Sequence, residues 1–285
     1  MQQIEPGIYY EDAYHGVTLG ALIFNHGTVM IDAPLRPDDA RSWRAALINM
    51  GGSTNRILIN LDAHPDRTLG ARALDCPIVA HEKTAQVFHD RPTIFKGQTS
   101  ESGAEWEINN EMVGTRWSPP DITFSDSMNF HWGGPKVVLE YHPGPTQGSV
   151  WAIIPDAKVV FVGDTIIADQ PPFLAQSDLP AWIEALDVLL SSYRDFLIIS
   201  ARSGPVGGSE VRSEQRYLKK IVAGLERLAK RNASPETTEG LISSLLKSFS
   251  LTNTQRERYA QRLRYGLYQY YTHHYHPIED LPEEE

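Results

Sequence analysis

The chain has 285 residues, of which 41% are hydrophobic and 22% charged, and a formal net charge of −10. This length and composition predict one α/β domain with an appendage and a core that needs no disulfides. Because binding to a phosphate backbone depends on Lys and Arg, the acidic balance argues against a nucleic-acid partner. No apolar run approaches the roughly 18 residues of a membrane span, so no membrane partner is expected.

The cysteine content and the N-terminus both bear on the compartment. A single cysteine, Cys76, excludes an internal disulfide framework and suits a reducing interior. Residues 1–7 lack the basic and apolar regions of a signal peptide. We therefore expect a cytoplasmic protein.

The first half of the chain alternates strands with helices. Residues 20–24 and 27–32 predict a hairpin, and Pro37 begins a helix that Gly51 and Gly52 end. Further elements are a buried strand over 56–60, a helical pattern that begins near Thr68, and a short strand over 76–80.

Residues 85–135 are less regular, and long irregular segments of compact domains tend to be lids or binding loops. Their aromatic side chains are expected to anchor the segment to the body, with one or two lining a substrate mouth as the alternative. These aromatics are Phe95, Trp106, Trp117, Phe130 and Trp132.

In the second half, residues 136–141 and 149–154 predict paired strands, and Asp178 begins a helix that precedes a strand over 196–199. From about residue 209 the pattern becomes helical, with three helices expected. Residues 265–276 are rich in Tyr and contain His273, His274 and His276. Adjacent side chains on a helix diverge by about 100°, so an aromatic face that docks this helix is favoured over one shared metal ion.

Residues 60–70 carry the most information about chemistry. They follow the buried strand and contain Asp62, His64 and Asp66, with Arg67 directly after. A cluster of His and Asp at a strand-to-helix corner is typical of a metal-binding loop.

This segment resembles the metal loop of the metallo-β-lactamase superfamily, whose signature is H-x-H-x-D-H. His64 and Asp66 match the signature, whereas Asp62 and Arg67 stand where it has its other two His. Four further landmarks occur in the family's order. They are the hairpin that ends in a structural aspartate, Asp32; residues 142–150, similar to T-P-G-H-T-P-G-S; residues 159–164, which end in the bridging Asp164; and residues 201–205, similar to P-G-H-G-P.

The resemblance implies an αββα sandwich with a site at one edge between two sheets, and a hydrolase ancestry. We predict the sandwich over residues 1–208, a C-terminal helical extension over 209–276 and an acidic tail over 277–285. The extension resembles that of glyoxalase-like and sulfur- or quinoprotein-associated branches. This helical extension is compatible with a homodimer.

The resemblance also implies a two-metal site, yet several ligand positions are changed. The positions of the first metal's ligands hold Asp62, His64, Pro145 and Asp164, and those of the second hold Asp66, Arg67, Asp164 and Ser203. Neither proline nor a permanently protonated guanidinium can ligate a metal through its side chain. Superfamily members with Arg in place of the loop's last His compensate with a Cys elsewhere, and Cys76 is the only one here.

Clustered carboxylates repel one another, so something positive must lie among them. Arg67 and Arg202 can supply that charge by bidentate pairing, which predicts a pocket without a cofactor. The alternative is a single divalent cation, Mg²⁺, Mn²⁺, Fe²⁺ or Zn²⁺, bound by Asp62, His64 and Asp164.

The sequence therefore predicts a hydrolase-like protein that has lost its dizinc site and binds a small ligand or a partner, either metal-free or with altered catalysis. The alternative is a hydrolase of a thioester, lactone or similar ester that uses one residual metal. Candidate catalytic residues are Asp66, His64 and Arg67, and candidate pocket residues are His142, Arg202 and Ser203. A hydrogen-bonded structural role for His142 is the competing interpretation.

Overall fold

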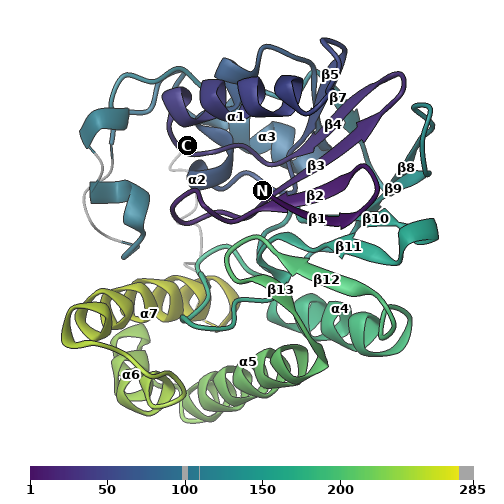
Figure 1. The fold of residues 1–285 in the computed structure, drawn as a ribbon. Coiled ribbons are helices and arrows are strands. Elements are labelled where there is room, and N and C mark those ends of the chain that lie inside the picture. The colour runs from purple at the N-terminus through teal and green to yellow at the C-terminus, as the bar shows by residue number, and fades with distance from the viewer. Residues whose placement is uncertain (98–101, 109, 276–285) are drawn as a thin grey trace, which may run out of the picture.

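The protein is described by a computed structural model that covers residues 1–97, 102–108 and 110–275. Two β-sheets lie face to face, with helices on their outer sides (Figure 1). The predicted αββα sandwich with C-terminal helices is confirmed. No helix in these ranges is long and apolar enough to cross a membrane.

The first sheet has seven strands in sequence order. Neighbours from β1 to β4 are antiparallel, and those from β4 to β7 are parallel. The strands are β1 (Gln2–Glu5), β2 (Ile8–Glu11), β3 (Leu19–Phe24), β4 (Gly27–Ile31), β5 (Arg56–Ile59), β6 (Ile78–His81) and β7 (Ile122–Phe124).

The second sheet has six strands in the order β13-β12-β11-β10-β9-β8, and only the β11–β12 pair is parallel. The strands are β8 (Ser127–Phe130), β9 (Val137–Tyr141), β10 (Val150–Ile154), β11 (Val159–Phe161), β12 (Leu197–Ser200) and β13 (Gly204–Val206).

Helices cover the outer faces of both sheets. The α-helices are α1 (Pro37–Asn49), α2 (Pro65–Thr68), α3 (Glu82–Asp90), α4 (Leu179–Ser191), α5 (Gly208–Ala229), α6 (Glu239–Leu246) and α7 (Asn253–Tyr275). The 3₁₀ helices are η1 (Ala71–Leu74), η2 (Glu105–Ile108), η3 (Asn110–Met112), η4 (Pro155–Ala157), η5 (Gly163–Thr165) and η6 (Pro235–Thr238).

The two-residue period of the strands produces the layers. Val29 and Ile31 of β4 lie in the core between the sheets together with Val150 of β10. The intervening Met30 packs under α1, and Trp151 packs under the helices of the second half. Because successive strand side chains point to opposite faces, strands that are apolar throughout require a helix layer outside each sheet.

Two segments differ from the sequence prediction. The helix after the metal-like loop begins at Pro65 rather than near Thr68 and has 4 residues, because proline is favoured in the first turn of a helix. The segment expected to be irregular contains α3, β7 and β8; the His81 side chain caps α3 by accepting from the amide of Lys83. A histidine cap is not a common helix-start signal, so little in the local sequence indicates this helix.

The aromatic side chains of residues 85–135 anchor that segment to the body. Phe95, Trp106 and Trp117 are buried in one cluster, and Phe130 and Trp132 pack against the core between the sheets. The structure thus confirms the anchoring interpretation.

The C-terminal helices share one core with α4. Figure 1 shows α5, α6 and α7 together on the side of the second sheet, and their buried residues include Leu218, Leu245 and Leu263, in one cluster with Trp182 of α4. Tyr270 and Tyr271 of α7 are buried, which confirms the predicted aromatic docking face. His276 and residues 277–285 lie outside the described residues.

Candidate functional site

The site is built on the loop between β5 and α2. Asp62 shapes this loop, because its Oδ1 accepts from the backbone amide of His64 at 2.8 Å and its Oδ2 lies 2.8 Å from His64 Nδ1. Asp32, directly after β4, stabilises the same loop, because its Oδ1 accepts a hydrogen bond from the amide of Leu61 at 2.9 Å. The structural role predicted for Asp32 is confirmed.

Arg67 lies at the centre of the site and is completely buried. Its Nη2 donates to Asp164 Oδ1. Its Nη1 lies 3.4 Å from Asp62 Oδ2 and 3.8 Å from Asp32 Oδ2, and its Nε lies 3.7 Å from Asp66 Oδ1. One guanidinium is thus surrounded by carboxylates from three segments.

Arg202 follows β12 and approaches the same carboxylates from the second sheet. Its Nε donates to Asp164 Oδ2 at 3.0 Å, and its Nη1 donates to Asp66 Oδ2. Its guanidinium carbon lies 5.1 Å from the centroid of Phe173 and 5.6 Å from that of Trp106, within cation–π range. Both carboxylate oxygens of Asp164 are therefore engaged by guanidinium groups.

The local backbone brings Asp164 to this point. Gly163 has a positive φ of 60°, a conformation that favours glycine, and it turns the chain directly after β11. A Cβ at Gly163 would lie 3.6 Å from Arg67 Nη1, so the backbone passes close to the guanidinium.

Burial and the two guanidiniums together set the pKa values of the carboxylates. Burial raises the pKa of Asp164, but Arg202 and Arg67 outweigh it and hold the pKa well below its ordinary value. Against the same effect of burial, Arg67 lowers the pKa of Asp62. At Asp32 burial prevails over Arg67 and raises the pKa to about 8, so this group carries its proton at neutral pH.

His64 is the most exposed side chain of the cluster. Its side chain is 12% exposed, and its ring lies 5.6 Å from Phe173 and 6.0 Å from Trp106. Asp62, His64 and Asp164 each offer one ligand atom, and these atoms lie within 4.8 Å of one another. This set could therefore hold a single cation.

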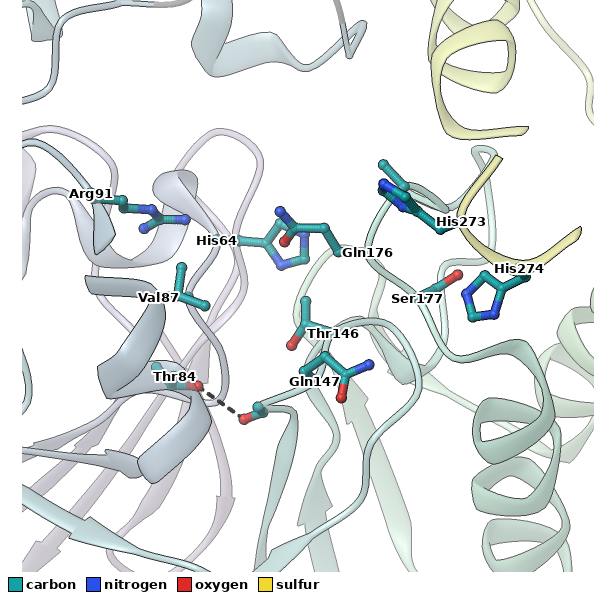
Figure 2. A pocket seen from close by; sticks show the side chains of 13 residues that line it. His64, Thr84, Val87, Arg91, Thr146, Gln147, Gln176, Ser177, His273 and His274 are labelled. Carbon is teal, nitrogen blue, oxygen red and sulfur yellow. Dashed lines mark hydrogen bonds between the residues drawn. The ribbon is translucent and has the colours of Figure 1, made fainter. Parts of the chain in front are cut away.

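A cavity of about 330 Å³ opens beside His64. Its lining includes side chains that the sequence did not single out as site residues, from the residue after α3, from the loop after β9 and from the loop before α4 (Figure 2). They are Arg91, Gln147 and Gln176. His273 and His274, noted in the sequence as part of a histidine-rich helix, reach this cavity from α7.

The other predicted residues lie around the cluster in different ways. His142 stacks on Trp151 with 3.6 Å between ring centroids, and its Nε2 lies 3.3 Å from Glu140 Oε2. Ser203 Oγ accepts from the amide of Ala168 at 3.0 Å. Arg202 and Ser203 line a separate cavity of about 250 Å³ rather than the one beside His64.

The sequence of the chain matches a known family. The model of the family described as the metallo-beta-lactamase superfamily matches residues 22–201, which is more than half of the chain. The chain belongs to the metallo-β-lactamase superfamily. A metallo-beta-lactamase type 2 of Pseudomonas aeruginosa is 22% identical over 258 residues, covering 82% of this chain and 89% of that protein.

Solved structures of other proteins share the fold. A metallo-beta-lactamase family protein of Thermus thermophilus has a TM-score of 0.62 at 18% identity, covering 93% of this chain and 94% of its own. The stereoselective inverting sec-alkylsulfatase of a Pseudomonas species has a TM-score of 0.67 at 16% identity, covering 98% of this chain and 51% of its own. Both similarities extend into the C-terminal helices. The branch of the superfamily stays a prediction.

Proposed function

We propose that this chain is a superfamily member in which two arginines replace the metal pair, and that it binds a small ligand or a partner without a dizinc centre. The observation that carries the proposal is the engagement of both oxygens of Asp164 by Arg67 and Arg202. A carboxylate that bridges two metals needs those oxygens for the ions.

The donor chemistry at the implied ligand positions does not fit a metal pair. Arg67 is a buried cation, Pro145 has no donor atom in its side chain, and the Ser203 hydroxyl oxygen is bound to a backbone amide. Burial raises the pKa of the Cys76 thiol to about 11, and Cys76 packs under α1 rather than at the site. A thiolate ligand that would compensate for Arg67 is therefore not supplied within the described chain.

Charge balance supports the same proposal. Three carboxylates, Asp62, Asp66 and Asp164, lie against the two guanidiniums of Arg67 and Arg202, so fixed positive charges already lie among them. Two divalent cations would add four positive charges beside buried Arg67, where water screens poorly.

The chemical consequence concerns the nucleophile. A metal lowers the pKa of bound water from about 15.7 to about 7, which supplies hydroxide at neutral pH. A cluster held by arginines has no such hydroxide, so hydrolysis of thioesters, lactones or lactams would lose its attacking group. His64 is the cluster member that lines the cavity, so altered catalysis without metal would depend on it first; roles for Asp66 and Arg67 stay predictions. A cytoplasmic location also stays a prediction.

The convergence of Asp62, His64 and Asp164 favours one alternative function. In that alternative, these three residues hold a single divalent cation, and the protein hydrolyses a thioester, lactone or similar ester. Arg67 Nη1 lies 3.4 Å from Asp62 Oδ2, so such a cation would share this carboxylate with a guanidinium.

Elemental analysis of protein purified without chelator tests the proposal. We expect clearly less than about one equivalent of any divalent metal per chain, and no change in metal content on Asp164→Asn. Two zinc ions per chain would overturn the proposal. One ion that Asp164→Asn removes, together with turnover of thioester or lactone substrates, would establish the alternative instead.

A further inference from the structure

The Arg91 guanidinium lines the cavity beside His64 and forms no salt bridge with a carboxylate of the described chain. Arg91 directly follows α3, and its guanidinium carbon lies 4.8 Å from the ring centroid of Trp117 and 5.3 Å from that of Phe88. These rings fix the position of the side chain by cation–π contact. Its Nη1 atom is buried and has no hydrogen-bond partner among the described residues.

The unsatisfied Nη1 atom of Arg91 has an energetic cost. Burial lowers the pKa of Arg91 to about 10, so the group remains charged at neutral pH. The Arg91 side chain is half-buried, and a buried polar atom without a hydrogen-bond partner, such as its Nη1, is unfavourable because such atoms in native proteins are normally satisfied. An anion in the cavity would satisfy Arg91.

The composition of the cavity lining points to the same ligand chemistry. No Asp or Glu side chain lines this cavity within the described chain, although the protein has 36 acidic residues. The side chains of Gln147 and Gln176 line the cavity, are exposed, and form no hydrogen bond with the described residues. By contrast, the hydroxyl groups of Thr84 and Ser177 already donate to backbone carbonyls. Arg91 and the two amides are thus available as donors to a ligand.

Helix α7 supplies the opposite wall. Figure 2 shows Arg91 at one side, His273 and His274 at the other, and His64 and Gln176 between them. The His274 ring stacks on Tyr270 with 4.1 Å between centroids, which fixes its orientation. The cavity is therefore bordered by nitrogen-bearing side chains from both halves of the chain.

We propose that this cavity binds a small organic anion whose carboxylate or phosphate group pairs with Arg91, and whose remainder extends towards α7. Planar guanidinium groups pair bidentately with both kinds of oxyanion. The volume of about 330 Å³ is at the lower end of the range for small-molecule sites, about 300–1,000 Å³. The inference rests on the proposed function, because it names the ligand class of the same pocket.

Calorimetric titration with matched probes tests the assignment. Hexanoate and hexyl phosphate carry the two anionic groups on one alkyl chain, and hexanol is their neutral counterpart. We expect at least one anion to bind at least about tenfold more tightly than hexanol. The stronger of the two anions identifies the preferred group.

Substitution of Arg91 provides the second arm. Arg91→Met should weaken binding of that anion at least about tenfold, and Arg91→Lys should weaken it less because the charge remains. Arg116→Met, at an exposed arginine outside the cavity, is the matched control and should bind as the wild type does. Circular dichroism and the melting temperature of each variant report whether it is folded.

The outcomes separate this inference from the proposed function. Equal binding of hexanol, failure of both anions to bind, or unchanged affinity in folded Arg91→Met would overturn the anion site. Metal content measured on the same preparations tests the metal-free proposal independently of anion binding. If the protein contains metal and its anion binding depends on Arg91, the anion site is supported and the replacement of the metals by arginines is refuted. If the protein is metal-free and Arg91→Met leaves binding unchanged, the replacement is supported and the anion site is refuted.

Discussion

The sequence resemblance predicts that Arg67 stands where the superfamily pattern has a metal-ligating imidazole, and in the structure Arg67 is a buried cation surrounded by carboxylates. Its nitrogens lie within 3.8 Å of Asp32, Asp62 and Asp66, and it donates to Asp164. A guanidinium suits this position better than an ammonium, because its planar fork directs several N–H groups at once. The cost of burying each charge is offset only while its partners are present.

We expect Arg67→Met to lower the free energy of unfolding by about 3–5 kcal/mol, because it leaves buried carboxylates without a counter-charge. Urea unfolding followed by tryptophan fluorescence would measure the loss. The control is Arg36→Met, at a side chain that is 49% exposed and pairs with Glu111, where the loss should not exceed about 1 kcal/mol. Equal losses in the two variants would contradict the assigned role of Arg67.

The buried side chain of Arg262 links helix α7 to the loops around the site. The Nη1 of Arg262 donates to Gln170 Oε1 at 2.7 Å and to the carbonyl of Pro171 at 2.9 Å, and its Nη2 donates to the carbonyl of Gly103 at 3.2 Å. Its guanidinium carbon lies 4.0 Å from the centroid of Phe173, the ring that also contacts His64. The element that carries the two cavity histidines is thus tied to the loops around the cluster.

Arg262→Met should weaken this attachment and lower the free energy of unfolding by about 2–4 kcal/mol, since charged hydrogen bonds to three acceptors are lost. Limited proteolysis should then cleave α7 or its preceding loop faster than in the wild type. Arg264→Met on the same helix is the control, because Arg264 is 55% exposed and pairs with Glu239 at 2.9 Å. Comparable proteolysis of the two variants would show that Arg262 is not the attachment.

Two groups of acidic residues act oppositely on the stability of the whole molecule as pH changes. The arginines hold the pKa values of Asp62 and Asp164 below their ordinary range against the effect of burial, so these residues bind fewer protons in the folded state. Burial raises the pKa values of Asp32 and Glu214 to about 8, so these residues bind more. Stability rises with pH where the unfolded state binds more protons, and falls where the folded state does.

The stabilising contribution of the first group is present above about pH 4 and is lost as pH falls below it. The second group lowers stability between about pH 4 and pH 8, by up to about 1.4 kcal/mol per pH unit for each residue. The combined contribution of these four residues to stability is therefore greatest on the acidic side of neutrality. Urea midpoints measured from pH 3 to pH 9 should show both declines.

Glu214→Gln should flatten the alkaline decline, because the amide mimics the protonated acid and does not titrate. Glu226→Gln, at an exposed glutamate of the same helix α5, is the matched control and should leave the slope unchanged. A wild-type slope in Glu214→Gln between pH 5 and pH 8 would refute the raised pKa of Glu214.

The parts of the molecule that local pattern controls agree with the sequence. The hairpin that ends at Asp32 and helix α4 capped by Asp178 follow from alternation, turn residues and capping. Short elements with weak signals are not predicted in this way, as with α3, whose cap is His81. In these places packing of the aromatic cluster outweighs local propensity.

By itself the sequence determined the superfamily fold and predicted the exchange of ligands at Arg67, Pro145 and Ser203, because both depend on residue identity at positions along the chain. Only the tertiary structure decided that Arg67 and Arg202 meet on opposite oxygens of Asp164, and that Arg91 lies across a cavity from His273. These residues are far apart in the chain, and local sequence periodicity carries no information about how close they lie in space. Packing of the two sheets and of α7 brings them together.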